Sequence, residues 1–115
     1  MAVQTNDARA MLEHERAEAV EHIASLSQQF DEVVESIVDV ANDDEHDPEG
    51  HTIAVERQQL AGLLRDARLH LTEVNEAVGR LGDGTYGLCE DCGSPVRAER
   101  LAALPATRTC VECAI

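Results

Sequence analysis

Two long stretches of the chain carry a hydrophobic residue every three or four positions. In residues 5–41 the hydrophobic positions are Leu12, Ala19, Ile23, Leu26, Phe30, Val33, Ile37 and Val40. Steps that alternate between three and four are the a/d heptad pattern of a coiled-coil helix. Thr5, Asn6 or Asp7 can cap the start, and no Gly or Pro interrupts the stretch. The pattern predicts one long helix over residues 5–41.

The same pattern returns in residues 52–81. Its hydrophobic positions are Ile53, Leu60, Leu64, Ala67, Leu71, Val74, Val78 and Leu81. Arg16 in the first stretch and Arg57 in the second fill the one place that breaks each pattern. The two sets pair in reverse order at a nearly constant register, from Val40 with Ile53 to Leu12 with Leu81. This predicts an antiparallel helical hairpin that turns near residues 46–47, with arms of roughly 55 Å at about 1.5 Å per residue.

The segment between the two predicted helices is strongly acidic. Five carboxylates lie within the seven residues 43–49. Pro48 and Gly50 are expected to account for the break between the two helices. Taken by itself, the segment is most simply a solvated loop. A calcium-binding loop is disfavoured, because the Asp-x-Asp-x-Asp-Gly spacing and the glutamate at position twelve are absent.

All four cysteines of the chain lie near its C-terminus, in the spacing C-x2-C-x17-C-x2-C. They are Cys89, Cys92, Cys110 and Cys113. Two such pairs form a tetrahedral thiolate site, for which Zn²⁺ is the usual ion, and four thiolates leave no open position for catalysis. A module of about 30 residues buries too little apolar surface to fold alone, so the metal should supply much of its stability. The other interpretations are two disulfides in a secreted domain, an iron–sulfur site, and a redox thiol pair; no signal peptide is recognisable ahead of the cysteines.

Composition narrows the choice of partner. The net charge is −14, with a single Phe, a single Tyr and no Trp. Such a chain is repelled by phosphate backbones and offers no stacking platform for single strands, so a basic protein surface is the expected partner. No apolar run of about 18 residues is present, and we expect a soluble, cytoplasmic protein without a membrane span. No catalytic set of side chains is recognisable, and we expect no enzymatic activity.

The residues around the cysteines carry a family resemblance. Gly84, Tyr86 and Gly87 precede Cys89, Gly93 follows Cys92, and Arg100, Leu101 and Pro105 stand before the second pair. This arrangement resembles the DksA/TraR family of bacterial transcription regulators. The resemblance implies a hairpin that enters the secondary channel of RNA polymerase and presents an acidic D-x-x-D-x-A tip near the catalytic centre.

Carried onto this sequence, the tip motif falls in the acidic segment. Asp44 and Asp47 supply the two aspartates, Glu49 replaces the alanine, and Asp43 is a neighbouring candidate. The family also uses basic residues on the second helix and after the last cysteine to hold ppGpp against polymerase. Here those regions carry Asp66, His70 and Glu73, and Ala114 follows the last cysteine, so we expect little direct effect of ppGpp.

The resulting prediction is an all-α protein with a long antiparallel coiled-coil hairpin over residues 1–83, an acidic tip at 42–51, and a zinc-ribbon module over 84–115. Residues 99–104 are expected to form a short helix stopped by Pro105. The expected cofactor is one structural Zn²⁺, and the expected partner is RNA polymerase. We expect a monomer and no sequence-specific DNA binding. The alternatives are a zinc-thiolate redox sensor and a coiled-coil adaptor with no link to transcription.

Overall fold

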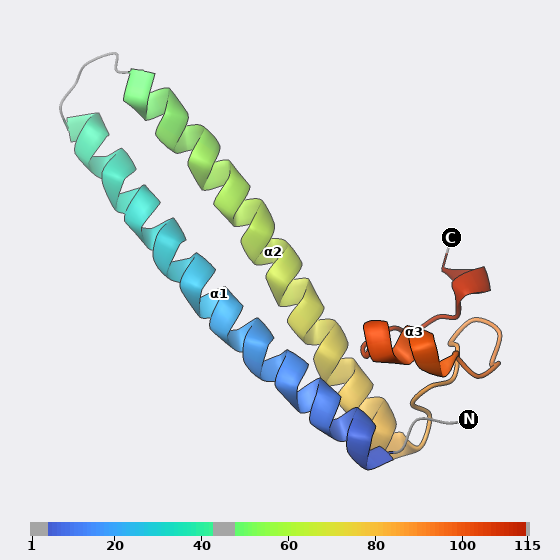
Figure 1. Cartoon of the computed structure of the whole chain (residues 1–115). Coiled ribbons are helices and arrows are strands. Elements are labelled where there is room, and N and C mark those ends of the chain that lie inside the picture. Colours follow the sequence, from blue (N-terminus) through green and yellow to red (C-terminus); the bar gives the residue numbers. More distant parts are fainter. Residues whose placement is uncertain (1–4, 43–47, 115) are drawn as a thin grey trace. The chain divides into compact units, whose positions relative to one another are not determined.

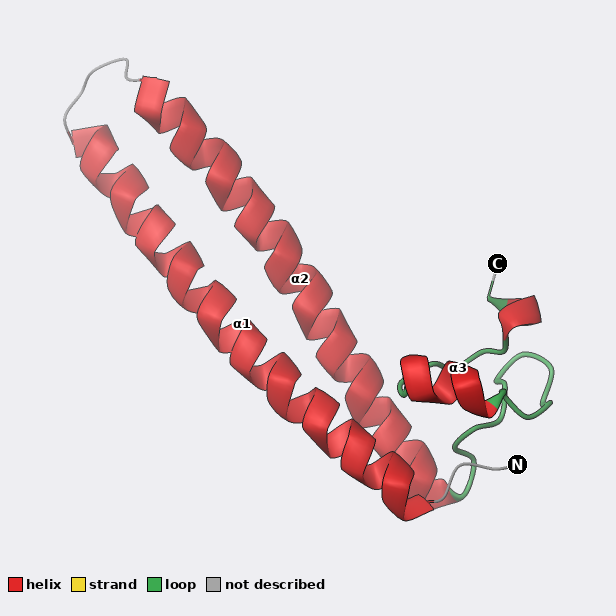
Figure 2. Ribbon diagram, viewed as in Figure 1, coloured by secondary structure: helices red, strands yellow, loops and turns green. Residues whose placement is uncertain are grey.

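The chain is helical throughout its regular structure. The computed structural model describes residues 5–42 and 48–114, with side chains described for 6–36 and 52–114. The helices are α1 (Thr5–Asn42), α2 (Pro48–Asp83) and α3 (Ala98–Ala103), followed by a short 3₁₀ helix, η1 (Val111–Cys113). No strand occurs in the described part of the chain, where the only extended pairing is a single bridge between Leu88 and Pro95. The predicted all-α class is therefore confirmed (Figure 1, Figure 2).

The boundaries of the long helices differ from the prediction by one to four residues. Helix α1 ends one residue later than expected, whereas α2 begins at Pro48, four residues before the predicted start. Pro48 therefore lies at the boundary between the two helices, as expected, whereas Gly50 lies inside α2. Proline suits the first turn of a helix because the N–H it lacks would have no partner there, and one glycine costs a helix only about 1 kcal/mol. Asp43, Asp44 and Asp47 lie outside the described residues, and Glu49 belongs to α2 without a described side chain.

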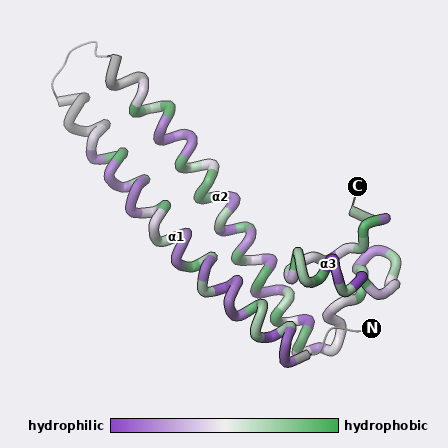
Figure 3. The backbone as a smooth tube through the Cα atoms, viewed as in Figure 1, coloured by the Kyte–Doolittle hydropathy of each residue, from purple (hydrophilic) through white to green (hydrophobic). Residues whose placement is uncertain are grey.

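Two compact units make up the chain. The hairpin unit comprises Ala19–Leu69, and the cysteine unit joins the residues up to Glu18 with those from His70 onward. In the hairpin unit the core consists of Leu26, Val33, Leu60, Leu64 and Ala67, flanked by Ile23, Phe30 and Ile53. All eight belong to the predicted seams, so the antiparallel pairing of the two helices is confirmed in this unit. Figure 3 shows hydrophobic and hydrophilic positions alternating along the backbone tube of these helices.

The cysteine unit has a core of its own, formed near the start of α1 and the end of α2. Leu12 and Val74 are fully buried together with Ala77, and Val78, Leu81, Tyr86 and Ala106 pack against them. Ala77 was not among the predicted seam residues. An alanine on a helix carries little hydrophobic signal, so its burial depends on which side chains surround it. This core joins the long helices to the segment that carries the cysteines.

Within the stretches that the structure describes, none of the helices combines the length and the hydrophobicity needed to cross a bilayer.

Candidate metal centre

The first cysteine pair lies in a tight backbone turn. The N–H of Gly93 donates to the carbonyl of Cys89 at 2.9 Å, and the N–H of Cys89 donates to the carbonyl of Ser94 at 2.8 Å. Gly93 has a φ of 75°, a left-handed conformation that costs glycine little and other residues more. The turn thus brings Cys89 and Cys92, three positions apart, to the same side of the loop.

The second pair brackets η1, with Cys110 at its N-cap and Cys113 as its last residue. The N–H of Cys113 donates to the carbonyl of Cys110 at 3.2 Å, which closes a single helical turn between the two cysteines. The N–H of Glu90, inside the first pair, donates to the carbonyl of Arg108 at 2.9 Å. This bond links the two segments and holds the pairs face to face.

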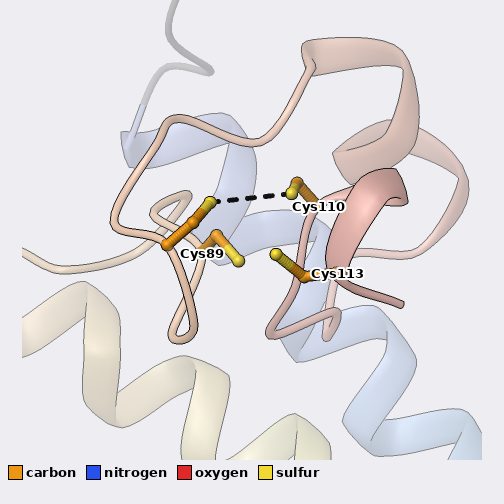
Figure 4. A group of neighbouring side chains, drawn as sticks. Cys89, Cys110 and Cys113 are labelled. Atoms are coloured by element: carbon orange, nitrogen blue, oxygen red, sulfur yellow. Dashed lines mark hydrogen bonds between the residues drawn. The ribbon is translucent and has the colours of Figure 1, made fainter. Parts of the chain in front are cut away.

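The four sulfur atoms converge. All of them lie within 4.8 Å of one another, and the Sγ atoms of Cys92 and Cys110 are 3.8 Å apart. In Figure 4 the labelled side chains of Cys89, Cys110 and Cys113 point toward one common centre. Zinc–sulfur bonds of about 2.3 Å in a tetrahedron require sulfur–sulfur distances of roughly 3.8 Å. None of the four cysteines forms a disulfide. The cluster fits one structural zinc ion.

The ionisation of the thiols also favours the binding of a metal cation. Backbone hydrogen bonds from Cys110 and from Cys92 lower the pKa of the Cys89 thiol to about 6. Hydrogen bonds with the sulfurs of Cys110, Cys89 and Cys92 instead raise the pKa of Cys113. Sulfurs this close cannot all carry a negative charge without a compensating ion, and a bound divalent cation deprotonates its thiol ligands outright.

A small core supports the cluster from inside the module. Cys89, Val96 and Leu101 are buried together, with Tyr86, Cys110 and Cys113 against them. Gly87 borders this core, since an added Cβ would make an ordinary contact with Leu101 Cδ1 at 3.5 Å, and its φ of 86° favours glycine. Leu101 belongs to α3, which is shifted by one residue from the predicted helix over 99–104. Half of the residues in this core are cysteines, so its packing depends on whether their sulfurs are held together by a metal ion.

Three side chains hold the loop that leads into the second pair. The hydroxyl of Tyr86 donates to the carbonyl of Pro105 at 2.8 Å, and burial raises the pKa of that phenol. The guanidinium of Arg80 donates to the carbonyls of Ala106 and Thr107 at 3.5 and 3.4 Å. Arg100 donates to the carbonyl of Thr109 at 3.0 Å and to the Thr107 hydroxyl at 3.3 Å. Tyr86 and Arg100 belong to the sequence motif, whereas Arg80 was missed because no local pattern distinguishes it from other helix arginines.

Comparison with known proteins agrees with this geometry. Residues 84–115 match the family described as the prokaryotic dksA/traR C4-type zinc finger. General stress protein 16O of Bacillus subtilis (strain 168) is 28% identical over 109 residues, which are 94% of this chain and 67% of that protein. The RNA polymerase-binding transcription factor DksA of Caulobacter vibrioides is 38% identical over 42 residues, which are 36% of this chain and 30% of that protein.

A solved structure shares the fold. The structure of transcription factor DksA2 from Pseudomonas aeruginosa has a TM-score of 0.53 and 23% sequence identity, over 90% of this chain and 79% of that one. In the sequence alignments above, this chain spans about two thirds of the length of the Bacillus protein. It spans less than a third of the length of the Caulobacter protein. Residues 84–115 thus carry a dksA/traR-type C4 zinc finger with its four cysteines clustered, and the chain as a whole is similar in fold to DksA2.

Proposed function

We propose that this chain is a non-enzymatic transcription regulator that acts by binding RNA polymerase. The observation that carries the proposal is the C4-type zinc finger of residues 84–115 on a chain with two long antiparallel helices. A relative that is 38% identical over 42 residues is named an RNA polymerase-binding transcription factor. The acidic composition favours a protein partner over nucleic acid, because a chain of net charge −14 is repelled by phosphates.

The proposal gives each part of the chain a task. Residues 1–83 form the hairpin that enters the secondary channel of polymerase, and residues 84–115 form the zinc module. Cys89, Cys92, Cys110 and Cys113 are the four zinc ligands, and the ion is structural because the four thiolates fill its coordination sphere. Asp43, Asp44, Asp47 and Glu49 form the acidic tip that alters initiation.

Binding to polymerase is tested by affinity capture. Zinc-loaded protein with a terminal tag should retain the subunits of RNA polymerase from a bacterial lysate, and purified core polymerase should compete for the same beads. A coiled-coil adaptor would retain other proteins and no polymerase. Failure of purified polymerase to bind the isolated, zinc-loaded chain would contradict the proposal.

The tip is predicted to act after binding. Asp44→Asn combined with Asp47→Asn keeps side-chain size and removes two charges. We expect binding within a few-fold of wild type, because exposed charged contacts add little net affinity once their desolvation is counted. We also expect loss of the effect on initiation, since chemistry at a catalytic centre responds to nearby charge. Competitive binding and promoter-specific transcription assays measure the two outcomes.

The control for the tip variant removes the same number of negative charges at positions outside the tip. Glu13→Gln combined with Glu21→Gln removes two carboxylates from the exposed face of α1. This control should bind and regulate like wild type. Normal regulation by the tip variant would mean that the segment is only a solvated loop, and complete loss of binding would mean that it is an anchor.

The response to ppGpp is predicted to be weak. Asp66, His70 and Glu73 occupy the part of α2 where the family uses basic residues, and acidic groups repel a polyphosphate. Transcription assays with and without ppGpp, each with and without this protein, should show additive rather than synergistic effects. Strong synergy that depends on this protein would overturn the prediction. Asp66→Arg combined with Glu73→Arg is the complementary variant, which should gain a response if charge is the deciding factor.

A further inference from the structure

The cysteine unit contains a groove that the zinc site does not use. Its walls are Glu15 of α1, His70 and Glu73 of α2, and residues 103–107 of the loop after α3. The cavity volume is about 210 Å³. Pockets for drug-sized ligands usually measure about 300–1,000 Å³. The groove is therefore suited to one or two side chains of a partner rather than to a free small molecule.

One wall of the groove is apolar and held in place. It comprises Ala103, Leu104, Pro105 and Ala106 with Thr107, and Leu104 is 51% exposed. The carbonyls of Pro105, Ala106 and Thr107 already accept hydrogen bonds from Tyr86 and Arg80. The segment thus has few backbone acceptors left to offer a ligand, and its fixed position lowers the ordering cost of binding.

The opposite wall is acidic. Glu15 Oε2 lies 2.8 Å from His70 Nε2, and Glu73 is half-buried beside them. No lysine or arginine is among the residues that line the groove. The two glutamates therefore favour a cationic group in a cleft that also offers apolar surface, on a chain that already carries a net charge of −14.

The spacing of these side chains decides which cation fits. Among the described residues, only the four cysteines bring three or more potential metal ligands within 4.8 Å of one another. Glu15, His70 and Glu73 are more widely spread, which does not suit a bare metal ion. A guanidinium is planar and broad, carries five N–H donors, and can bind separate carboxylates through different edges.

We propose that this groove is a docking site for an arginine-bearing segment of a partner protein, with the guanidinium between Glu15 and Glu73 and a neighbouring apolar side chain on Leu104. The proposal goes beyond the proposed function, because it assigns a recognition chemistry to one surface and is tested without polymerase. Arginine is enriched in protein interfaces, and its charged hydrogen bonds to carboxylates are stronger than neutral ones.

The test uses the full zinc-loaded chain and a short probe. The probe is the capped peptide acetyl-Ala-Leu-Arg-Leu-Ala-amide, and its control carries citrulline, which has the shape of arginine without the charge. In ¹H–¹⁵N NMR titrations, amide shifts should concentrate at Glu15, His70, Glu73 and residues 103–107, and should saturate at millimolar peptide. The citrulline peptide should bind about tenfold more weakly, which corresponds to about 1.4 kcal/mol.

Variants separate the groove from general attraction to an acidic chain. Glu15→Gln combined with Glu73→Gln should lower the affinity for the arginine peptide about tenfold. Leu104→Ala should lower the affinity for both peptides. Glu13→Gln combined with Glu21→Gln removes the same charge outside the groove and should leave binding unchanged. Circular dichroism and zinc content would confirm that each variant is folded.

Three results would overturn the docking site. One is the absence of saturable amide shifts at the groove. Another is an equal loss of affinity for the arginine peptide in the Glu15→Gln/Glu73→Gln and Glu13→Gln/Glu21→Gln variants. The third is equal binding of the arginine and citrulline peptides. Because none of these measurements involves RNA polymerase, the docking site and the proposed function can fail independently.

Discussion

Cys92→Ser is expected to abolish zinc binding and to unfold residues 84–115, while most of the helicity of α1 and α2 remains. Cys92 is the exposed member of the four-cysteine cluster, and its sulfur lies 3.8 Å from that of Cys110. A serine hydroxyl is a poor zinc ligand compared with a thiolate. Because changes even outside the ligand shell cost about 10–100-fold in metal affinity, loss of a ligand should cost more than about 100-fold.

Unfolding follows metal loss because the module has little else to hold it together. Its core is Cys89, Val96 and Leu101 with two more cysteines and Tyr86 at the edge. Structural zinc contributes about 10–16 kcal/mol in comparable small peptides. Without the ion, the metal–sulfur bonds that join the two cysteine pairs are lost, and the pairs separate. The helices keep the hairpin core of Leu26, Val33, Leu60, Leu64 and Ala67, which contains no cysteine.

Metal analysis and NMR measure the two effects. Fresh wild-type protein kept under reducing conditions should contain one zinc per chain, and the variant almost none. Amide signals of residues 84–115 should collapse into the unfolded region of the spectrum, with far-UV circular dichroism reduced only modestly. Ser94→Ala is the matched control, since it changes an exposed side chain in the same loop and keeps the carbonyl that accepts from Cys89. A variant that retains a full equivalent of zinc would show that Cys92 is not a ligand.

Leu12→Ala is expected to produce the largest loss of stability outside the zinc site. Leu12 is fully buried and packs with Val74 and Ala77, and Tyr86 and Ala106 close the same cluster. Leucine-to-alanine changes in such cores lower the free energy of unfolding by about 2–5 kcal/mol, through lost transfer energy and the cavity that remains. Since small domains are stable by only about 5–15 kcal/mol, this is a large fraction of the total.

Urea unfolding of the zinc-loaded protein, followed by circular dichroism, gives the size of this effect. The control is Leu63→Ala, because Leu63 is 51% exposed on α2 and alanine is an equally good helix former. A surface change of this kind should shift the free energy of unfolding by no more than about 0.5 kcal/mol. Equal midpoints for the two variants would mean that the Leu12 cluster does not support the fold.

Much of the molecule is determined locally by its sequence. The three-and-four spacing of residues such as Leu26, Val33, Leu60 and Leu64 defines one apolar face on each long helix, and that face must be buried whatever the surroundings. The same reasoning applies to the cysteines, because an x2 spacing places both sulfurs of a pair on one side of a tight turn. The helices, their antiparallel pairing and the four-cysteine cluster could therefore be predicted.

The remaining features were decided by tertiary structure. Arg80 has the pattern of any helix arginine, and its role exists only because a loop 26 residues away presents the carbonyl of Ala106 to it. Ala77 is buried because Leu12 and Val74 surround it, although an alanine in a helix sequence does not by itself indicate a buried position. Helix α2 begins at Pro48 and runs through Gly50, because proline suits the first turn and one glycine costs a helix only about 1 kcal/mol. The groove between Glu73 and Leu104 likewise joins residues of different elements. Periodicity along a chain encodes which face of a helix is buried, whereas hydrogen bonds and cavities between distant segments depend on how those segments meet.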